Sequence, residues 1–258
     1  MPSRQVVIHT GRELPGIRVA AQAAALVLEQ LCGAVRPGVS TLELDQLAGK
    51  LIADTGGTSA FHGYLGYPAQ TCISLNEEVV HGIGQATRII VPGDLVSLDV
   101  GVQLDGFIGD NARTVCAGIE PTPEQESLLS ATREGLAAGI AAAKGGNYVN
   151  DISRAVEESV SKNGFGIVRD FVGHGCGTKL HEAPEVPNFA QRARGARLQP
   201  GMVLAIEPMV NAGTHRVVVD PIDKWTVRTA DGAPSAHFEH MVLITKDNAE
   251  ILTWPKTV

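Results

Sequence analysis

The chain has 258 residues, of which 44% are hydrophobic and 19% charged, and 29 are glycines. This length fits one large α/β domain that buries about three quarters of its unfolded surface, and the composition excludes a disordered chain, a collagen and a coiled coil. The 21 basic and 28 acidic residues give a net charge of −7. A general nucleic-acid binder normally has the opposite sign, so we expect no DNA partner.

The sequence predicts a cytoplasmic protein without a membrane partner. Its first ten residues contain no apolar segment of the length that a secretory signal needs. The most apolar stretch, Val19 to Leu28, is only about ten residues long, too short to span a bilayer. The four cysteines lie without C-x-x-C spacing, which indicates free thiols in a reducing compartment.

The first part of the chain predicts two helices. An Ala/Leu-rich run indicates a helix over 17–35. Ser40 followed by Glu43 has the spacing of a capping box, and the leucine stripe behind it predicts a second helix that stops at Gly56. Extended segments punctuated by glycine follow over 61–84.

Two strands and a second pair of helices follow. The pattern indicates strands over 95–101 and 107–115, which flank a turn near Asp105. Helices are then predicted over 123–144 and 149–161, with glycine-rich, strand-like segments behind them. The order of elements in the first half therefore recurs in the second.

This recurrence has a fixed spacing of 108 residues, as from residue 92 to residue 200. Segment 92–99 matches segment 200–207, so that Asp99 falls on Glu207 after apolar positions in both. The same spacing relates three further pairs: Gly38 and Gly146, Leu44 and Ile152, and Gly56 and Gly164. A period this long is not that of a solenoid. It predicts two similar helix-helix-strand halves, roughly 13–120 and 121–250, although Pro-Gly before an apolar strand also recurs by chance.

The predicted hairpin brings two carboxylates together. Its two-residue loop is either 104–105 or 105–106, which places Asp99 directly opposite Asp110 or on its diagonal. In both registers the two side chains share one face, with Cβ atoms about 5 to 8 Å apart. Carboxylates this close repel each other unless a proton or a cation lies between them. The ordinary alternative is a surface hairpin, which often carries two acids.

Three further polar residues lie at the ends or centres of apolar strands. Glu207 ends one such strand, Glu239 enters another, and His174 lies among three glycines. Each of them alone has a structural explanation. Together with Asp99 and Asp110 they make four carboxylates and one imidazole, the ligand set of a dinuclear divalent site. Oxygen-rich ligation without sulfur favours Mn²⁺, Fe²⁺ or Co²⁺, with Zn²⁺ as a further option.

In their order along the chain, these residues resemble the type I methionine aminopeptidases over essentially the whole sequence. The resemblance is carried by segments 76–83, 97–100, 109–110, 173–175, 181–182, 206–210 and 238–240. It implies the α/β (α+β) pita-bread fold, with two pseudo-symmetric halves around a curved antiparallel sheet and a dinuclear metal centre. It also implies a monomeric cytoplasmic hydrolase that removes the initiator methionine from nascent chains with a small second residue.

The resemblance also implies a role for each candidate site residue. By position, Asp99, Asp110, His174, Glu207 and Glu239 would hold two divalent cations, with Asp110 and Glu239 bridging them. Glu207 would in addition accept a proton from water and pass it to the leaving amine. The short separation of Glu207 and Glu239 is similar to that of type I rather than type II enzymes.

Two histidines and a pocket complete the set. His181 would hydrogen-bond the substrate and stabilise the developing oxyanion, and His81 would lie near the scissile nitrogen. The residues that match the family's methionine pocket are Tyr64, Tyr67, Cys72 and Trp225. A structural histidine or an ordinary core residue is the alternative at each position.

The chain departs from the family pattern at Leu65, Gly84, Ile108, Asn111 and Leu180. None of these is a predicted metal ligand. The departures therefore concern the shape of the pocket, the catalytic efficiency and the tolerance for the second residue, not the class of reaction.

Two other functions fit the same fold. An aminopeptidase P or prolidase-like enzyme would prefer substrates with proline second. A catalytically silent protein that binds peptides or ribosomes should have lost metal ligands, whereas all five are present here. Arg192, Arg194 and Arg197 form a small basic cluster that suits either ribosomal RNA or, more simply, a solvated loop.

Overall fold

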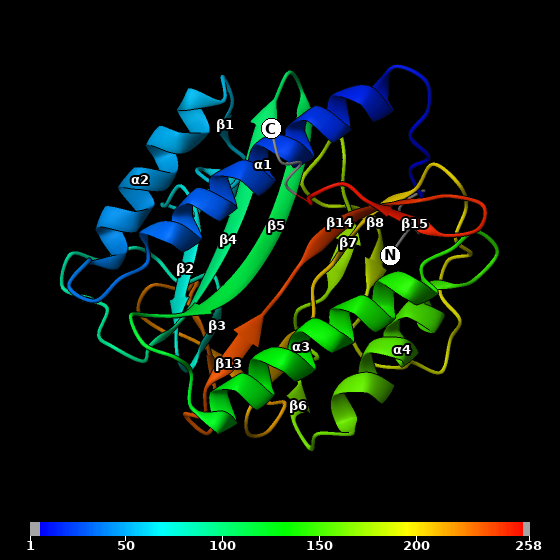
Figure 1. Cartoon of the computed structure of the whole chain (residues 1–258). Coiled ribbons are helices and arrows are strands. Elements are labelled where there is room, and N and C mark those ends of the chain that lie inside the picture. The colour runs from blue at the N-terminus through cyan, green and yellow to red at the C-terminus, as the bar shows by residue number, and fades with distance from the viewer. Residues whose placement is uncertain (1–5, 255–258) are drawn as a thin grey trace.

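The computed structural model describes residues 6–254 and contains two halves, each of which begins with two helices and continues into strands (Figure 1). The elements of the first half are α1 Glu13–Ala34, α2 Thr41–Asp54, β1 Thr58–Ser59, the short 3-10 helix Tyr64–Gly66, β2 Cys72–Leu75, β3 Glu78–Val80, β4 Leu95–Leu104 and β5 Phe107–Cys116. Those of the second half are α3 Pro123–Ala142, α4 Val149–Ser161, β6 Gly166–Ile167, β7 Gly173–Gly175, β8 Glu182–Val186, β9 Val203–Ile206, β10 Met209–Asn211, β11 Val217–Val219, β12 Val227–Thr229, β13 Ser235–His237, β14 His240–Ile244 and β15 Ala249–Ile251.

A local sequence signal accounts for the start of α2. The Ser40 hydroxyl accepts the Glu43 N–H at 3.2 Å, and the Glu43 carboxylate accepts the Ser40 N–H at 2.8 Å, which confirms the predicted capping box of α2. The prediction for the first helix was wrong at its start, because α1 begins at Glu13. Pro15 lies in its first turn, where a missing N–H costs no helical hydrogen bond.

Helix α1 is also longer than its most apolar stretch suggested. By length and composition alone, its 22 residues are long and apolar enough to cross a membrane. The prediction that the apolar segment is too short to span a bilayer was therefore wrong. Half of its most apolar window is buried inside the protein, where it packs against β4 and β5. This burial is what a core helix requires.

The repeat of 108 residues is visible in the backbone. Helices α1 and α3 end at Ala34 and Ala142, and helices α2 and α4 begin at Thr41 and Val149. The glycine pairs at this spacing share the left-handed conformation: Gly38 (φ 90°) and Gly146 (φ 95°), Gly56 (φ 81°) and Gly164 (φ 76°), and Gly93 (φ 89°) and Gly201 (φ 96°). Equivalent turns in both halves explain why glycine recurs there, since other residues rarely adopt this conformation.

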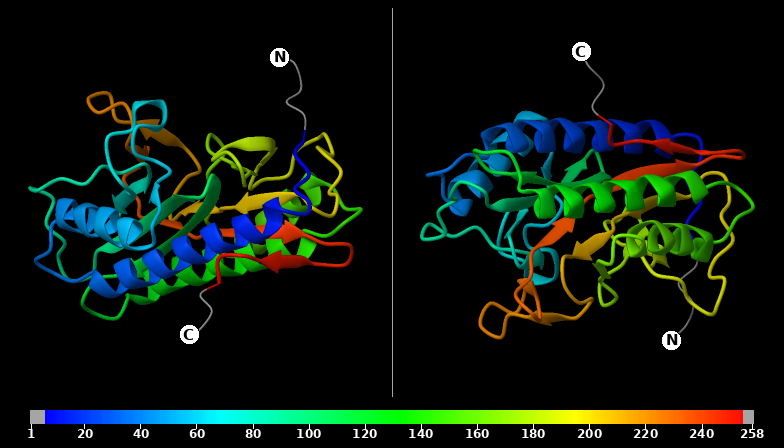
Figure 2. Two further views of the ribbon diagram at one scale, coloured as in Figure 1. Left: turned by 90° about the horizontal axis from the view of Figure 1, so that it is seen from above. Right: turned by 60° about the horizontal axis from the view of Figure 1, so that its bottom comes forward.

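The strands form antiparallel sheets with the helices on one side. In the first half β1, β4 and β2 pair in this order and β5 pairs with β4; in the second half the order is β15-β14-β9-β7-β8. Two small sheets, β13-β10-β6 and β11-β12-β3, lie beside them. Figure 2 shows the long helices on one face, while the loops around 60–67 and 214–226 stand out from the other.

Each half has its own apolar core. One cluster lies between α1, α2 and strands β2 and β4, and another between α3, α4 and strands β9 and β14. The halves meet where β5 runs beside β13 and β14. At this junction the Glu239 N–H donates to the Ala112 carbonyl at 2.9 Å, and the Asp110 N–H to the Met241 sulfur at 3.0 Å.

Gly109 of β5 lies where helix α1 packs closely against this strand. A Cβ at Gly109 would overlap the backbone of Ala20 and Ala21, which cannot rotate away. We therefore expect Gly109→Ala to lower the free energy of unfolding by about 1–3 kcal/mol or more, measured by urea denaturation. Gly33→Ala, in α1 itself, is the matched control, because its Cβ meets nothing within 4 Å; it should stabilise the protein by up to about 1 kcal/mol. Equal effects of the two substitutions would contradict this account of the packing.

Candidate metal centre and substrate pocket

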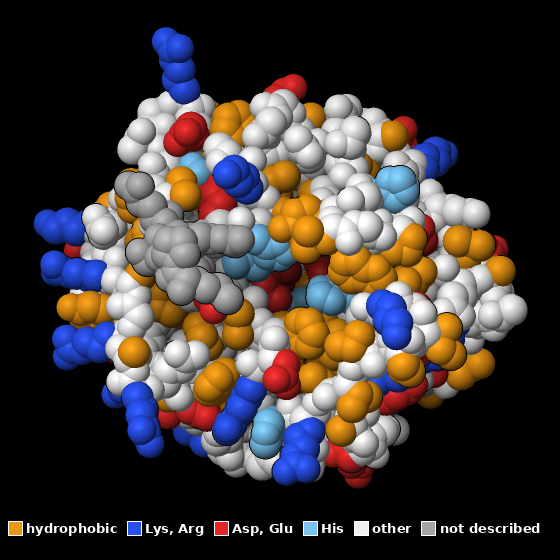
Figure 3. Space-filling model, turned by 180° about the vertical axis from the view of Figure 1, so that it is seen from behind, with side chains coloured by type: hydrophobic (Ala, Val, Ile, Leu, Met, Phe, Trp, Pro, Cys, Tyr) orange, Lys and Arg blue, Asp and Glu red, His pale blue; other side chains and the backbone are white. Residues whose placement is uncertain are grey.

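The predicted site residues converge on one cavity of about 190 Å³, which opens on the face opposite the helices (Figure 3). Its lining includes every one of them: Tyr64, Tyr67, Cys72, His81, Asp99, Asp110, His174, His181, Glu207, Trp225 and Glu239. Pockets for drug-sized ligands have about 300–1,000 Å³. This cavity therefore suits a group of the size of one amino-acid side chain.

The hairpin β4–β5 supplies two carboxylates from adjacent strands. Leu104 pairs with Phe107, so the loop consists of Asp105 and Gly106, both with positive φ. Of the two predicted registers the structure has the second, in which Asp110 faces Gly101 and lies diagonal to Asp99. The loop chemistry decides this register, because Asp-Gly favours the two positive φ angles of a tight hairpin turn.

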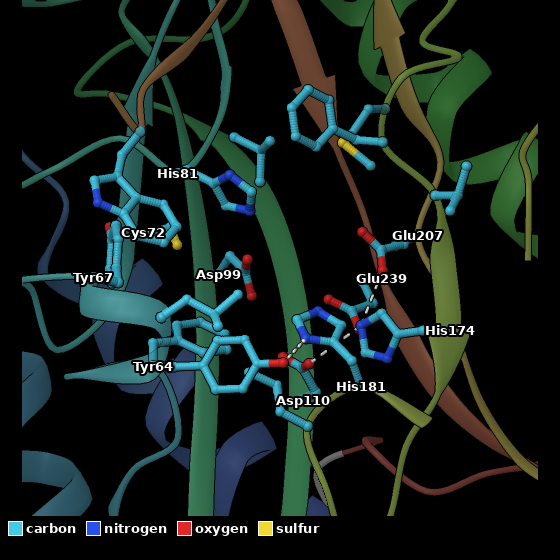
Figure 4. A pocket seen from close by; sticks show the side chains of 18 residues that line it. Tyr64, Tyr67, Cys72, His81, Asp99, Asp110, His174, His181, Glu207 and Glu239 are labelled. Carbon is cyan, nitrogen blue, oxygen red and sulfur yellow. Dashed lines mark hydrogen bonds and ion pairs between the residues drawn. The ribbon is translucent and has the colours of Figure 1, made fainter. Parts of the chain in front are cut away.

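The second half brings the other candidate ligands to the same place (Figure 4). Glu239 lies between β13 and β14, and one of its oxygens lies within 4.8 Å of ligand atoms of Asp99 and Asp110. Glu207 directly follows β9, and His174 lies in β7, the neighbour of β9. The His174 Nε2 is 3.4 Å from the Glu207 Oε1 and 3.9 Å from the Asp110 Oδ2.

Hydrogen bonding fixes the orientation of the imidazole. The His174 Nδ1 lies 3.0 Å from the Gly175 carbonyl oxygen, which can only accept, so Nδ1 carries the ring proton. Nε2 is then an acceptor that faces carboxylate oxygens. Burial, together with the charge of His181, lowers the pKa of His174 to about 3. A neutral imidazole with its lone pair among carboxylates has the form of a metal ligand.

The four carboxylates cannot all be ionised without compensation. Burial raises the pKa of Asp99 to about 7. Burial, followed by the charges of the neighbouring carboxylates, also raises the pKa values of Asp110, Glu207 and Glu239 well above their usual range. At neutral pH the cluster therefore takes up protons or cations.

The buried oxygens of the cluster also lack partners. Within residues 6–254, Asp99 Oδ1, Asp110 Oδ1 and Glu239 Oε1 are buried and accept no hydrogen bond. Buried polar atoms are normally satisfied, so three unsatisfied oxygens around one point call for a ligand. Carboxylate oxygens with one imidazole nitrogen form a donor set that fits hard or borderline divalent cations.

Two further histidines border the cluster. The His181 Nδ1 lies 2.7 Å from the Tyr64 hydroxyl, and its ring centre is 4.3 Å from that of His174. His81 follows β3 with a positive φ of 60°, a strained conformation of the kind that gathers at functional sites. Burial and the charge of His181 lower the pKa of His81 to about 4, so its imidazole is neutral.

Aromatic and apolar side chains form the walls of the cavity. The Tyr67 hydroxyl donates to the Gly82 carbonyl at 2.9 Å, and its ring meets Trp225 edge to face at 5.1 Å. Cys72 is buried beside them. The polar atom of Tyr67 is thus turned to the backbone, which leaves an apolar surface for a ligand.

The five departures from the family pattern fall in different places. Leu65 and Leu180 line the cavity, whereas Ile108 is buried in the core below it. Asn111 lines a groove on the other face of the protein, and a Cβ at Gly84 would contact α2. Two of the five residues therefore bear directly on the shape of the pocket.

Sequence reasoning missed two neighbours of Glu207. The His237 Nε2 lies 3.8 Å from the Glu207 Oε2, and the Asn188 side-chain amide donates to the Glu207 carbonyl at 3.1 Å. His237 ends β13, two positions before Glu239. That spacing was a usable signal, whereas no local pattern singles out Asn188.

Comparison with known proteins gives a consistent answer. The sequence model of metallopeptidase family M24 matches residues 15–246. A methionine aminopeptidase of Bacillus subtilis is 44% identical over 248 residues, covering 96% of this chain and 99% of the relative. One of Mycobacterium tuberculosis is 44% identical over 256 residues, covering 97% of this chain and 96% of the relative.

The solved structures agree in fold. The methionine aminopeptidase of Thermotoga maritima superposes with a TM-score of 0.93 at 41% identity, covering 96% of this chain and 99% of its own. A prolidase from Pyrococcus furiosus is 23% identical with a TM-score of 0.79 over 66% of its chain, which shows a shared fold only. The predicted pita-bread fold is thus confirmed. The chain belongs to the M24 metallopeptidases and, within them, to the methionine aminopeptidases.

Proposed function

We propose that this protein removes the initiator methionine from nascent polypeptides whose second residue is small, by hydrolysis of the first peptide bond. The observation that carries the proposal is the buried cluster of carboxylates with unsatisfied oxygens at the bottom of a pocket of side-chain size. The identity of the relatives supports the same reaction.

Two divalent cations would be held by Asp99, Asp110, His174, Glu207 and Glu239, of which Asp110 and Glu239 would serve both cations. Such cations would polarise the substrate carbonyl and lower the pKa of water so that a nucleophile is available at neutral pH. The donor set suits Mn²⁺, Fe²⁺, Co²⁺ or Zn²⁺.

The protein's own residues would position the substrate and move protons. Glu207, beside the cluster, accepts a proton from the attacking water and delivers it to the leaving amine. The neutral imidazole of His81 lies near the scissile nitrogen. When the Tyr64 hydroxyl donates to Nδ1 of His181, the ring proton lies on Nε2, which donates to the developing oxyanion.

The walls of the pocket suit a methionine side chain. Tyr64, Tyr67, Cys72 and Trp225 present aromatic and sulfur-containing surface, with Leu65 and Leu180 beside them. A flexible thioether fills such an irregular space well and gains contacts with aromatic rings.

We further propose one catalytic domain composed of the halves 13–120 and 121–250, acting as a monomer in the cytoplasm on nascent chains. Arg192, Arg194 and Arg197 could contact the ribosome, but a solvated loop is the simpler explanation for this basic cluster. All three side chains are exposed, and the Arg194 guanidinium lies over the Tyr148 ring at 4.8 Å, as in a solvated loop.

Metal binding can be tested without reference to activity. Addition of Mn²⁺ or Co²⁺ to the metal-free protein should raise the melting temperature, by the equivalent of about 2.7 kcal/mol at 100 times the dissociation constant. Asp110→Asn should abolish this increase, whereas Asp54→Asn, an exposed acidic position on α2, should retain it. A normal increase in Asp110→Asn would refute the ligand assignment.

Activity on short peptides tests the substrate class. Methionine release from Met-Ala-Ser should be lost with a chelator and restored by Mn²⁺ or Co²⁺, and Ala-Pro peptides should not be cleaved. Asp110→Ala or Glu239→Ala should lower the rate by more than the roughly 10- to 100-fold that loss of an outer-shell partner costs. Cleavage of Ala-Pro without methionine release would favour the prolidase-like alternative.

Tyr64→Phe tests the orientation of His181. The ring is retained and only the hydroxyl that meets Nδ1 is lost. Since one hydrogen bond contributes about 0.5–1.5 kcal/mol, we expect kcat to fall between about twofold and tenfold, with the melting temperature nearly unchanged. Unaltered steady-state kinetics would show that this contact does not assist the reaction.

A further inference from the structure

The loop that carries His181 is closed by the carboxylate of the next residue. One oxygen of Glu182, Oε1, accepts the N–H of Thr178 at 2.8 Å, the Thr178 hydroxyl at 2.7 Å and the N–H of Lys179 at 2.9 Å. Three donors on one oxygen hold the loop in a single shape. The position of His181 therefore depends on where Glu182 is held.

The second carboxylate oxygen of Glu182, Oε2, contacts His9, which precedes α1 near the N-terminus. The His9 Nε2 lies 2.9 Å from the Glu182 Oε2, and the two side chains are 1% and 2% exposed. A buried carboxylate is costly unless a cation pairs with it. Within residues 6–254, His9 is the only ion-pair partner of Glu182.

The segment around His9 is itself tightly enclosed. The His9 N–H donates to the Gly201 carbonyl at 2.8 Å, just before β9, the strand that leads to Glu207. A Cβ at Gly177 would come within 2.5 Å of the His9 Nε2, and one at Gly201 within 2.8 Å of the His9 carbonyl oxygen. The segment thus lies between the His181 loop and the strand of Glu207, where only glycine leaves room.

The charges around His9 favour its protonated form. Glu182 faces Nε2, and Glu13 of α1 lies 3.4 Å from Nδ1. Burial lowers the pKa of His9, but the hydrogen bond and charge of Glu182, with Glu13, outweigh burial, so the pKa is raised above its ordinary 6.5. For Glu182 the effects have the opposite sign. Burial raises the pKa of this carboxyl group, but its hydrogen bonds to His9, Thr178 and Lys179 outweigh burial and lower the pKa to about 2.

We propose that His9 is a positioning residue for the aminopeptidase reaction: its imidazolium binds Glu182 and so holds the adjacent His181 at the substrate. The N-terminal segment then belongs to the functional unit although it lies outside the pocket. This inference rests on the proposed function, because it assumes the role of His181 there.

The sign of the pH dependence follows from the two pKa shifts. Glu182 stays ionised down to acidic pH, so the pair persists on that side until pH falls towards 2. His9 is protonated below its raised pKa, and the pair loses its charge as pH rises through that value. The plot of kcat against pH should therefore fall on its alkaline side, and this alkaline limb should follow the deprotonation of His9.

Three variants separate positioning from mere stability. In His9→Gln the charge is lost, in His9→Lys a cation remains up to about pH 10, and His62→Gln changes an exposed histidine as the control. For His9→Gln we expect kcat on Met-Ala-Ser to fall about tenfold at pH values below the limb and to match that of the unmodified protein above it, with KM changing less and the limb disappearing. His9→Lys should recover most of kcat and move the limb to higher pH.

The outcomes are distinct. If His9→Gln and His9→Lys lower only the melting temperature and keep the kcat and pH profile of the unmodified protein, the proposal is overturned. If the unmodified protein releases no methionine with any metal, the proposed function fails instead. The positioning role is then judged by NMR of the metal-free protein. There the His181 ring signals should shift in His9→Gln and remain in place in His62→Gln, and unchanged signals would overturn the proposal.

Discussion

Mutual repulsion among buried carboxylates is the constraint on which this structure depends. Asp99, Asp110 and Glu239 bring oxygens within 4.8 Å of one another at the cavity, and three of these carboxylate oxygens are buried and accept no hydrogen bond within residues 6–254. Such an arrangement costs folding free energy when the groups are ionised, so the remaining chain must hold them together. The ten-residue ladder of hairpin β4–β5 and the short β13–β14 connection do so, and they hold the oxygens where cations can bind.

The repeat explains where the cluster lies. The 108-residue spacing places Asp99 and Glu207 at equivalent points of the two halves, each after a run of apolar residues. When the halves face each other, these carboxylates come together at the junction. The backbone bond from the Glu239 N–H to the Ala112 carbonyl crosses the same junction, so the position of Glu239 is set by contact between the halves.

Local signals in the sequence predicted the four long helices, the β4–β5 hairpin and a set of candidate ligands, but not the bounds of the short strands. The capping box of Ser40 and the Asp-Gly turn before Phe107 each depend on neighbouring residues, and both are present in the structure. The hairpin register was left between two choices, although the preference of Asp-Gly for two positive φ angles was a usable signal for the one that the structure has. The contacts of Tyr64 with His181 and of His9 with Glu182 had no local signal, since they join residues 117 and 173 positions apart. Such contacts follow from how the halves pack, which no short pattern encodes.

The residues that line the substrate side of the pocket are not related by the 108-residue repeat. The two halves therefore contribute different residues to substrate binding. Tyr64, Tyr67 and His81 come from the first half, and His181 and Trp225 from the second, without counterparts at the 108-residue spacing. A methionine side chain would therefore be held between surfaces that meet only when the halves are docked. The shared apolar cluster beneath the pocket, which joins Phe61 and Ile108 to Cys176 and Met241, keeps them docked. Loss of packing there should impair substrate binding even where every metal ligand remains, because the ligands and the pocket depend on the same junction.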